Sequence, residues 1–182
     1  LSKATIGNLD QLAELFGGAA KTVIARIGDQ NYFNLEGFIA AFNAISGEAE
    51  VRLESDIDLG TLKPDASGFD AGKQLLTVPA GAEVTFDLNG HTISAVLDTN
   101  INTYGSAYIL SNLGSLHLKG NGTLEANAAY GCTATLRNQS ADAVMVIEDV
   151  TIKSDGGNAV RNNGDLTIKS GHFSTTGSFG SW

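Results

Sequence analysis

The pattern of apolar residues changes once along the chain. In its first part, apolar positions recur every three or four residues in two segments, 9–16 and 34–46, as they do on one face of a helix. Asn34 is placed to cap the second helix, and Gly47 is placed to end it. Between the two segments, the apolar stretch 23–27 is typical of a short strand.

These elements divide the chain into two expected parts. Residues 1–30 are predicted to be an N-terminal docking segment, and residues 31–182 one domain that the helix over 34–46 caps. The docking surface is expected to be the apolar face of the first helix, which consists of Leu9, Leu12, Leu15 and Phe16.

After Gly47 apolar and polar residues alternate, which is the pattern of strands with one buried face. The clearest alternating segments begin at residues 51, 84, 116, 145 and 166, and Gly, Asn, Ser and Asp lie between them. Longer insertions fall at about 60–73, 94–107 and 125–131. No convincing helical pattern follows Gly47, so we expect the rest of the chain to be β-structure.

Three segments share a further signature: an apolar residue, a polar residue and an asparagine. They end at Asn112, Asn138 and Asn162, and each leads into a turn and a new strand. Equivalent residues in the same phase indicate a repeat rather than separate hairpins. In a parallel β-helix each turn stacks on the last, so the three asparagines are predicted to form a hydrogen-bonded ladder.

An antiparallel sandwich is the competing fold. It would use Asn89-Gly90, Asn121-Gly122 and Asn163-Gly164 as hairpin turns, because Asn-Gly favours tight two-residue turns. Hairpins do not explain why the asparagines recur in phase, and we therefore favour the stacked repeat.

Two stretches resemble a known group of proteins. Residues 31–59, NYFNLEGFIAAFNAISGEAEVRLESDIDL, and residues 75–94, LLTVPAGAEVTFDLNGHTIS, are similar to the opening of right-handed parallel β-helix domains of the pectin-lyase-like kind, found in bacterial surface proteins and phage virion appendages. The similarity extends over about residues 23–176. It implies an all-β solenoid, a right-handed parallel β-helix with a short N-terminal helical and strand segment and a capping helix. Members of the group differ in what they bind, so the resemblance does not assign an activity.

Composition and charge exclude several partners. The formal net charge of −9 argues against a nucleic acid, because phosphate binding needs clustered Lys and Arg. Cys132 is the only cysteine, which rules out an intrachain disulfide and a cysteine metal cluster. No apolar run approaches the roughly 20 residues of a membrane helix, and the N-terminal residues do not have the pattern of a signal peptide.

Catalytic groups are harder to find. Glycoside hydrolysis needs two carboxylates facing each other across the sugar. The acidic candidates are Asp56, Asp58, Asp65, Asp70, Glu148, Asp149 and Asp155, and we interpret them as solvated surface charges. A polygalacturonase-like Gly-His-Asp would be expected at 171–173, where the chain reads Gly-His-Phe.

The sequence also lacks the residue patterns of a metal site and of a lyase active site. The histidines His91, His117 and His172 lie at unlike phases of the repeat, and Arg137 and Arg161 share a phase without an acidic cluster for calcium. We therefore predict no catalytic residue, no metal and no cofactor.

Binding is the remaining class. Tyr104 and Tyr130 lie in insertions that should emerge on one face, and they are the candidate ligand-binding residues, with a glycan as the candidate ligand. We expect a non-catalytic structural or adhesive module on a virion surface: a capsid decoration protein, head fibre or spike. Its partners would be other structural proteins of the particle and further copies of itself, as a trimer. The alternatives are a bacterial cell-surface adhesin and a polysaccharide-processing lyase or hydrolase.

Overall fold

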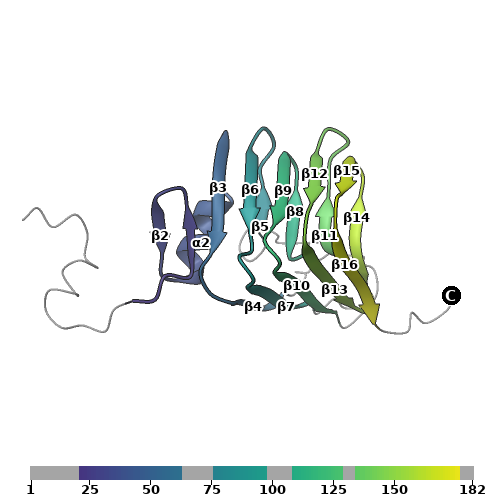
Figure 1. Cartoon of the computed structure of the whole chain (residues 1–182), viewed down its shortest axis with the longest axis horizontal. Coiled ribbons are helices and arrows are strands. Elements are labelled where there is room, and N and C mark those ends of the chain that lie inside the picture. Colours follow the sequence, from purple (N-terminus) through teal and green to yellow (C-terminus); the bar gives the residue numbers. More distant parts are fainter. Residues whose placement is uncertain (1–20, 63–75, 98–107, 129–133, 177–182) are drawn as a thin grey trace, which may run out of the picture.

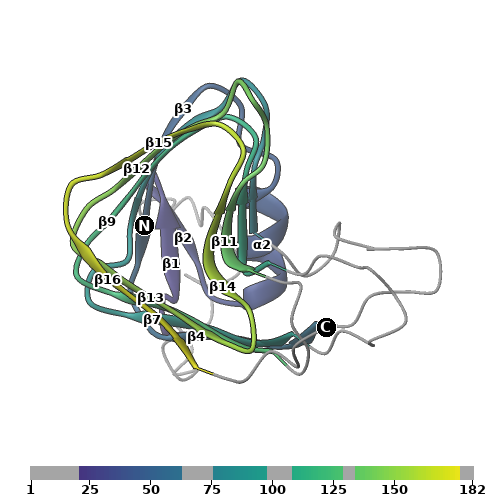
Figure 2. The same cartoon turned by 90° about the vertical axis from the view of Figure 1, so that its right-hand side faces the viewer.

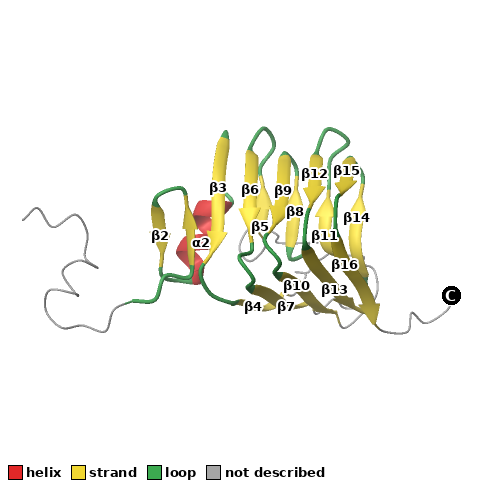
Figure 3. Ribbon diagram, viewed as in Figure 1, coloured by secondary structure: helices red, strands yellow, loops and turns green. Residues whose placement is uncertain are grey.

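The structure is a computed structural model, and it describes residues 21–62, 76–97, 108–128 and 134–176. Within these residues the fold is mainly β, with one helix at one end and stacked parallel sheets along the rest (Figure 3).

The first described elements form a small cap. Strands β1 (Ala25–Ile27) and β2 (Gln30–Tyr32) form an antiparallel hairpin, and helix α2 (Leu35–Phe42) follows. The Asn34 side chain caps the helix, because its Oδ1 accepts the Gly37 N–H at 2.8 Å. The α-helix ends at Phe42, earlier than the predicted residue 46. The Asn43 N–H still bonds to Ile39, four residues back, but the N–H groups of Ala44 and Ile45 bond three residues back.

The hairpin belongs to the body of the molecule. Strand β1 also pairs antiparallel with β3 (Glu48–Leu53), with Ala25 opposite Leu53. The predicted boundary at residue 30 therefore falls inside the hairpin, and the chain is part of the sheet from Ala25 onward.

The remaining strands are distributed over three sheets. Besides β1 to β3, the first sheet holds β6 (Glu83–Asp87), β9 (Ser115–Lys119), β12 (Val144–Ile147) and β15 (Asp165–Ile168). The second holds β4 (Ile57–Leu62), β7 (Thr92–Leu97), β10 (Thr123–Ala128), β13 (Val150–Asp155) and β16 (Gly171–Thr176). The third holds β5 (Leu76–Val78), β8 (Leu110–Asn112), β11 (Ala134–Asn138) and β14 (Asn158–Asn162).

From β3 onward, consecutive strands lie in different sheets, and every third strand returns to the same sheet and pairs in parallel. Figure 1 shows the strands following one another along the long axis, and Figure 2, turned by 90°, shows the three sheets around a common centre. Among the described strands, antiparallel pairing involves only β1. The antiparallel sandwich is therefore wrong: Asn89-Gly90, for example, connects β6 to β7 in a different sheet, with both residues at positive φ.

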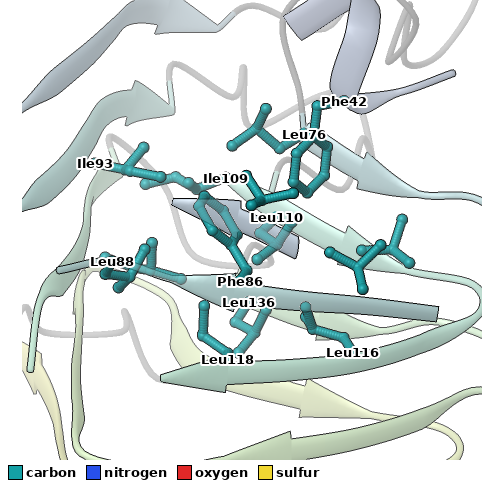
Figure 4. Close-up of a cluster of buried hydrophobic side chains, with 14 of the residues drawn as sticks. Phe42, Leu76, Phe86, Leu88, Ile93, Ile109, Leu110, Leu116, Leu118 and Leu136 are labelled. Carbon is teal, nitrogen blue, oxygen red and sulfur yellow. The ribbon is translucent and has the colours of Figure 1, made fainter. Parts of the chain in front are cut away.

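Parallel register stacks the core in columns. In the first sheet Val51, Phe86, Leu118, Ile147 and Ile168 occupy equivalent positions on successive strands. The first four are buried, and Figure 4 shows Phe86 and Leu118 among the side chains that fill the centre. Burying equivalent apolar residues on every turn stabilises each strand against its neighbours.

The two ends of the stack differ. At the start, the Phe42 ring of α2 packs on Phe86 with ring centroids 5.3 Å apart, which closes that end of the core. At the last strand of the first sheet, Ile168 is 50% exposed although it continues a buried column.

Candidate functional site

The asparagine ladder, defined as Asn112, Asn138 and Asn162, lies where the third sheet turns into the first. The three residues pair in register on adjacent strands. Nδ2 of Asn112 donates to Oδ1 of Asn138 at 2.9 Å, and Nδ2 of Asn138 donates to Oδ1 of Asn162 at 2.9 Å. Asn112 and Asn138 are fully buried, so these bonds satisfy groups that water cannot reach. The stack that the sequence predicted is therefore a structural feature of the corner.

The ladder asparagines also form hydrogen bonds to the backbone, either in the turn that follows their own strand or on the neighbouring turn of the stack. Nδ2 of Asn112 donates to the Val144 carbonyl, and Nδ2 of Asn138 donates to the Asp165 carbonyl, so each amide reaches the first residue of the following turn's strand. Within its own turn, Oδ1 of Asn112 accepts the Gly114 N–H. The ladder therefore links neighbouring turns through side chains as well as through strand pairing.

A second column, of charged residues, lies where the first sheet turns into the second. Its members are Arg52, Asp87 and Lys119, which pair in register, and Glu148 and Lys169, which directly follow the registered ends of β12 and β15. The sign of the charge alternates at every step from Arg52 onward, so Asp87, Lys119 and Glu148 each lie between opposite charges, which favours this order of strands. On its other side Arg52 lies opposite Arg26 of β1, and both guanidiniums approach the Glu54 carboxylate. Lys169 Nζ lies 3.1 Å from Glu148 Oε2, and His117 Nε2 lies 2.8 Å from the same oxygen. These contacts lower the pKa of Glu148, the Lys169 hydrogen bond most of all.

The acidic candidates for catalysis form structural hydrogen bonds, most of them to a residue of the neighbouring turn of the stack. Asp56 is 75% exposed, and its Oδ1 accepts the Thr92 N–H at 2.9 Å; this hydrogen bond is the main reason why its pKa lies below the ordinary value. Oδ1 of Asp58 accepts the Gly60 N–H at 2.8 Å. Asp149 accepts from the Ser170 hydroxyl at 2.6 Å.

Asp155 is likewise bonded, to the Thr176 hydroxyl of the next turn at 3.3 Å. The Asp58 contact stabilises its own turn, and the contacts of Asp56, Asp149 and Asp155 join neighbouring turns of the stack. Among the described residues no hydrogen bond joins two of these carboxyl groups. Asp65 and Asp70 lie outside the described residues.

Within the described residues, no group of three or more His, Cys, Asp or Glu side chains is arranged to hold a metal ion. His117 lies on β9 in the first sheet and His172 on β16 in the second, while His91 lies in the turn before β7. Nor does the described part contain a helix of the length and apolar character that crossing a membrane requires.

The outer face of the third sheet carries an arginine cluster, defined as Arg137, Arg161 and Tyr108. Arg137 and Arg161 lie opposite each other on the parallel strands β11 and β14. The Arg137 guanidinium lies over the Tyr108 ring, with Cζ 4.9 Å from the ring centroid, and Nη1 of Arg161 donates to the Tyr108 hydroxyl at 3.4 Å. Tyr108 is only 2% exposed.

The two guanidiniums have no acidic partner. In the described part of the chain, Arg26 pairs with Glu54 and Lys153 with Glu125, whereas neither Arg137 nor Arg161 forms an ion pair. Nε of Arg137 is buried and has no hydrogen-bond partner. The shared phase of the two arginines was visible in the sequence. Their contact with Tyr108 was not, because Tyr108 lies just before β8 and outside the repeating signature.

The other predicted site residues cannot be placed. Tyr104 and Tyr130, the candidate ligand-binding residues, lie outside the described residues. So does the predicted docking surface, which consists of Leu9, Leu12, Leu15 and Phe16. The described strands on either side of these two insertions belong to the second and the third sheet. They are β7 and β8 for the insertion with Tyr104, and β10 and β11 for the insertion with Tyr130.

Comparison of the chain with protein-family models, with curated proteins and with solved structures finds no match. The stacked sheets and the side-chain columns are therefore the basis on which a function is proposed.

Proposed function

We propose that this chain is a non-catalytic structural module, built as a right-handed parallel β-helix and displayed on the surface of a phage virion as a capsid decoration protein, head fibre or spike. Residues 1–20 would attach it to the particle, and the stack of sheets would project from the attachment point. The observation that carries the proposal is the in-register stacking of side chains from β3 to β16.

The order of strands supports the solenoid. One strand from each sheet follows another without exception from β3 to β16, and each returns in parallel beside its predecessor. Connections between parallel strands of one sheet are right-handed in nearly all known folds, which favours the right-handed coil. In such a coil every turn contacts mainly its neighbours, so stability grows turn by turn along the axis.

The side-chain columns favour the interpretation of the chain as a rigid structural module rather than an enzyme. The core column, the asparagine ladder and the charged column all join successive turns, and two of the three ladder residues, Asn112 and Asn138, are buried. The described acids Asp56, Asp58 and Asp149 accept structural hydrogen bonds, within a turn for Asp58 and from the next turn of the stack for Asp56 and Asp149. A rod of this kind suits a protein that must hold its shape while its ends make contacts.

The assignment to a virion follows from the resemblance of residues 31–59 and 75–94, and it can be tested by location. We expect antibodies against the chain to label intact phage particles of the source, and the protein to sediment with them. A variant that lacks residues 1–20 should keep its circular dichroism spectrum, because the described sheet begins at Ala25, but it should no longer sediment with particles. Labelling of bacterial cells instead of particles would contradict the virion assignment and support an adhesin.

Catalysis is tested separately. The full chain should release no reducing ends and no unsaturated products from pectate, alginate, hyaluronan or neutral glycans during long incubation. Turnover of any of these that disappears in the Asp56→Asn or Glu148→Gln variant would overturn the non-catalytic proposal.

A further inference from the structure

We propose that the arginine cluster, Arg137 and Arg161 with Tyr108, is a binding site for an oxyanion group, a carboxylate, sulfate or phosphate carried by an acidic ligand. The site lies on the outer face of the third sheet. It does not depend on the scaffold proposal, because it rests on the charges and contacts of these three side chains.

The first argument is electrostatic. Arg137 and Arg161 occupy directly opposed positions on adjacent parallel strands, where like charges repel. Elsewhere in the molecule such repulsion is compensated: the charged column alternates its signs from Arg52 to Lys169, and the opposed arginines Arg26 and Arg52 both lie near the Glu54 carboxylate. An anion between the two guanidiniums would replace the repulsion by two attractions.

The second argument is the surrounding column. The position that holds Arg137 and Arg161 on β11 and β14 holds Ser111 on β8 and Thr77 on β5. The column therefore contains no acid. By contrast, the stacked acids Glu48 and Glu83 are both exposed at the start of their strands, where water screens them.

The third argument is hydrogen bonding. A guanidinium has five N–H donors in a rigid fork, and it prefers the oxygens of carboxylate, sulfate or phosphate groups. Arg161 uses one donor on the Tyr108 hydroxyl. The Arg137 side chain forms no hydrogen bond, and its Nε is buried without an acceptor, although a buried unpaired donor is costly.

The fourth argument is preorganisation. The Tyr108 ring supports the Arg137 guanidinium through a cation–π contact, and its hydroxyl holds Arg161. Because Tyr108 is almost fully buried, both cations rest on a fixed surface. A ligand would then bind without first ordering two long side chains, which is the usual entropic cost of a surface arginine.

The test uses the arginine side-chain resonances of the full chain. The buried Arg137 Nε–H should give a slowly exchanging nitrogen–proton signal. We expect a saturable shift of this signal when sulfate, phosphate or glucuronate is added at constant ionic strength, and no such shift with chloride or neutral glucose. Comparison of glucuronate with sulfate and phosphate distinguishes a carboxylate ligand from a sulfated or phosphorylated one.

Two variants make the test specific. Arg161→Gln should weaken the binding of the preferred anion by about tenfold or more, since charge-assisted hydrogen bonds are lost. Lys119→Gln removes the same charge from a different column and should leave the affinity unchanged.

The thermal midpoint provides a second readout. The preferred anion should raise the midpoint of the unaltered chain and not that of Arg161→Gln, because only the former gains a bound ligand. The absence of a saturable shift with any of the three anions, or equal weakening by Lys119→Gln and Arg161→Gln, would overturn the site. Neither result would affect the labelling of particles.

Discussion

Asn138 donates a hydrogen bond of 2.9 Å from its Nδ2 to Oδ1 of Asn162, which lies directly opposite it on the next turn. The same Oδ1-to-Nδ2 relation links Asn112 to Asn138. A buried amide that both accepts from one turn and donates to the next makes the stacking of turns specific, because a shift by one residue would leave it unpaired.

Replacement of the middle asparagine should therefore be severe. Asn138→Ala removes the donor to Asp165 and Asn162 and also the acceptor of one Asn112 hydrogen bond, so that Asn112 keeps its bond to the Val144 carbonyl but loses the ladder bond. We expect a loss of about 3 kcal/mol in the free energy of unfolding, measured with urea, because buried polar groups lose their partners. Asn162→Ala is the control: Asn162 is exposed at the last turn, and its loss should cost about 1 kcal/mol. Equal effects of the two changes would contradict the ladder.

Glycine at the same corner has a steric role. A Cβ on Gly114 would overlap the backbone carbonyl oxygens of Pro79 and Ala82 on the preceding turn. Gly114→Ala should thus destabilise the protein by about 2–3 kcal/mol through forced separation of turns. Gly81→Ala is the matched comparison, because Gly81 has φ +79° and open space around it. It should cost only about 1 kcal/mol of backbone strain. Thermal unfolding of the two variants side by side measures the difference.

At one core position we expect a substitution to increase the stability of the protein. Ser154 is buried, its hydroxyl has no hydrogen-bond partner, and the residue opposite it on β10 is Ala126. Ser154→Ala removes an unpaired polar atom and continues the alanine column of Ala95 and Ala126. We expect the free energy of unfolding to rise by about 1 kcal/mol. Thr135→Ala is the contrast, since the Thr135 hydroxyl donates to the Lys153 carbonyl at 2.6 Å, and this change should destabilise. A destabilising Ser154→Ala would mean that the hydroxyl has a partner.

The charged column predicts a response to acid. The Lys169 and His117 contacts hold the folded-state pKa of Glu148 below its ordinary value of 4.5. A lowered folded-state pKa contributes stability that is complete above about pH 4.5 and is lost as the pH falls through the folded-state value. Glu148→Gln should therefore reduce the dependence of stability on pH below about 4.5. Urea unfolding at several pH values measures this slope.

Glu125→Gln is the control for the pH experiment, because Glu125 lies 3.9 Å from Lys153 at the partly exposed surface and its side chain lies outside the charged column. It should leave the acid slope nearly unchanged. If Glu148→Gln leaves the same slope as the unaltered chain, the contacts with Lys169 and His117 do not persist in solution.

Much of this architecture could be predicted from local patterns. Alternation of apolar and polar residues predicts strands, and Asn34 predicts where the helix begins, because both depend on neighbouring residues alone. The recurrence of Asn112, Asn138 and Asn162 in phase predicted which residues stack. That signal was available because a parallel stack repeats the same environment on every turn.

Contacts between parts of the chain that are not equivalent in the repeat could not be predicted from these patterns. The helix ends at Phe42 and the chain then turns tightly, because Ile45 is buried in the core while the backbone already leads toward β3. The pairing of β1 with β3 was likewise not predictable, because nothing in the sequence of a three-residue strand indicates which other strand it will pair with.

The sequence by itself determined the strand periodicity, the helix cap and the phase of the stacked asparagines, because each depends on spacing along the chain. Only the tertiary structure decided that Tyr108 lies beneath Arg137 and that Lys169 reaches Glu148. Those contacts join residues from different turns, and the distance between turns in space is set by packing of the whole stack rather than by the number of residues that separate them.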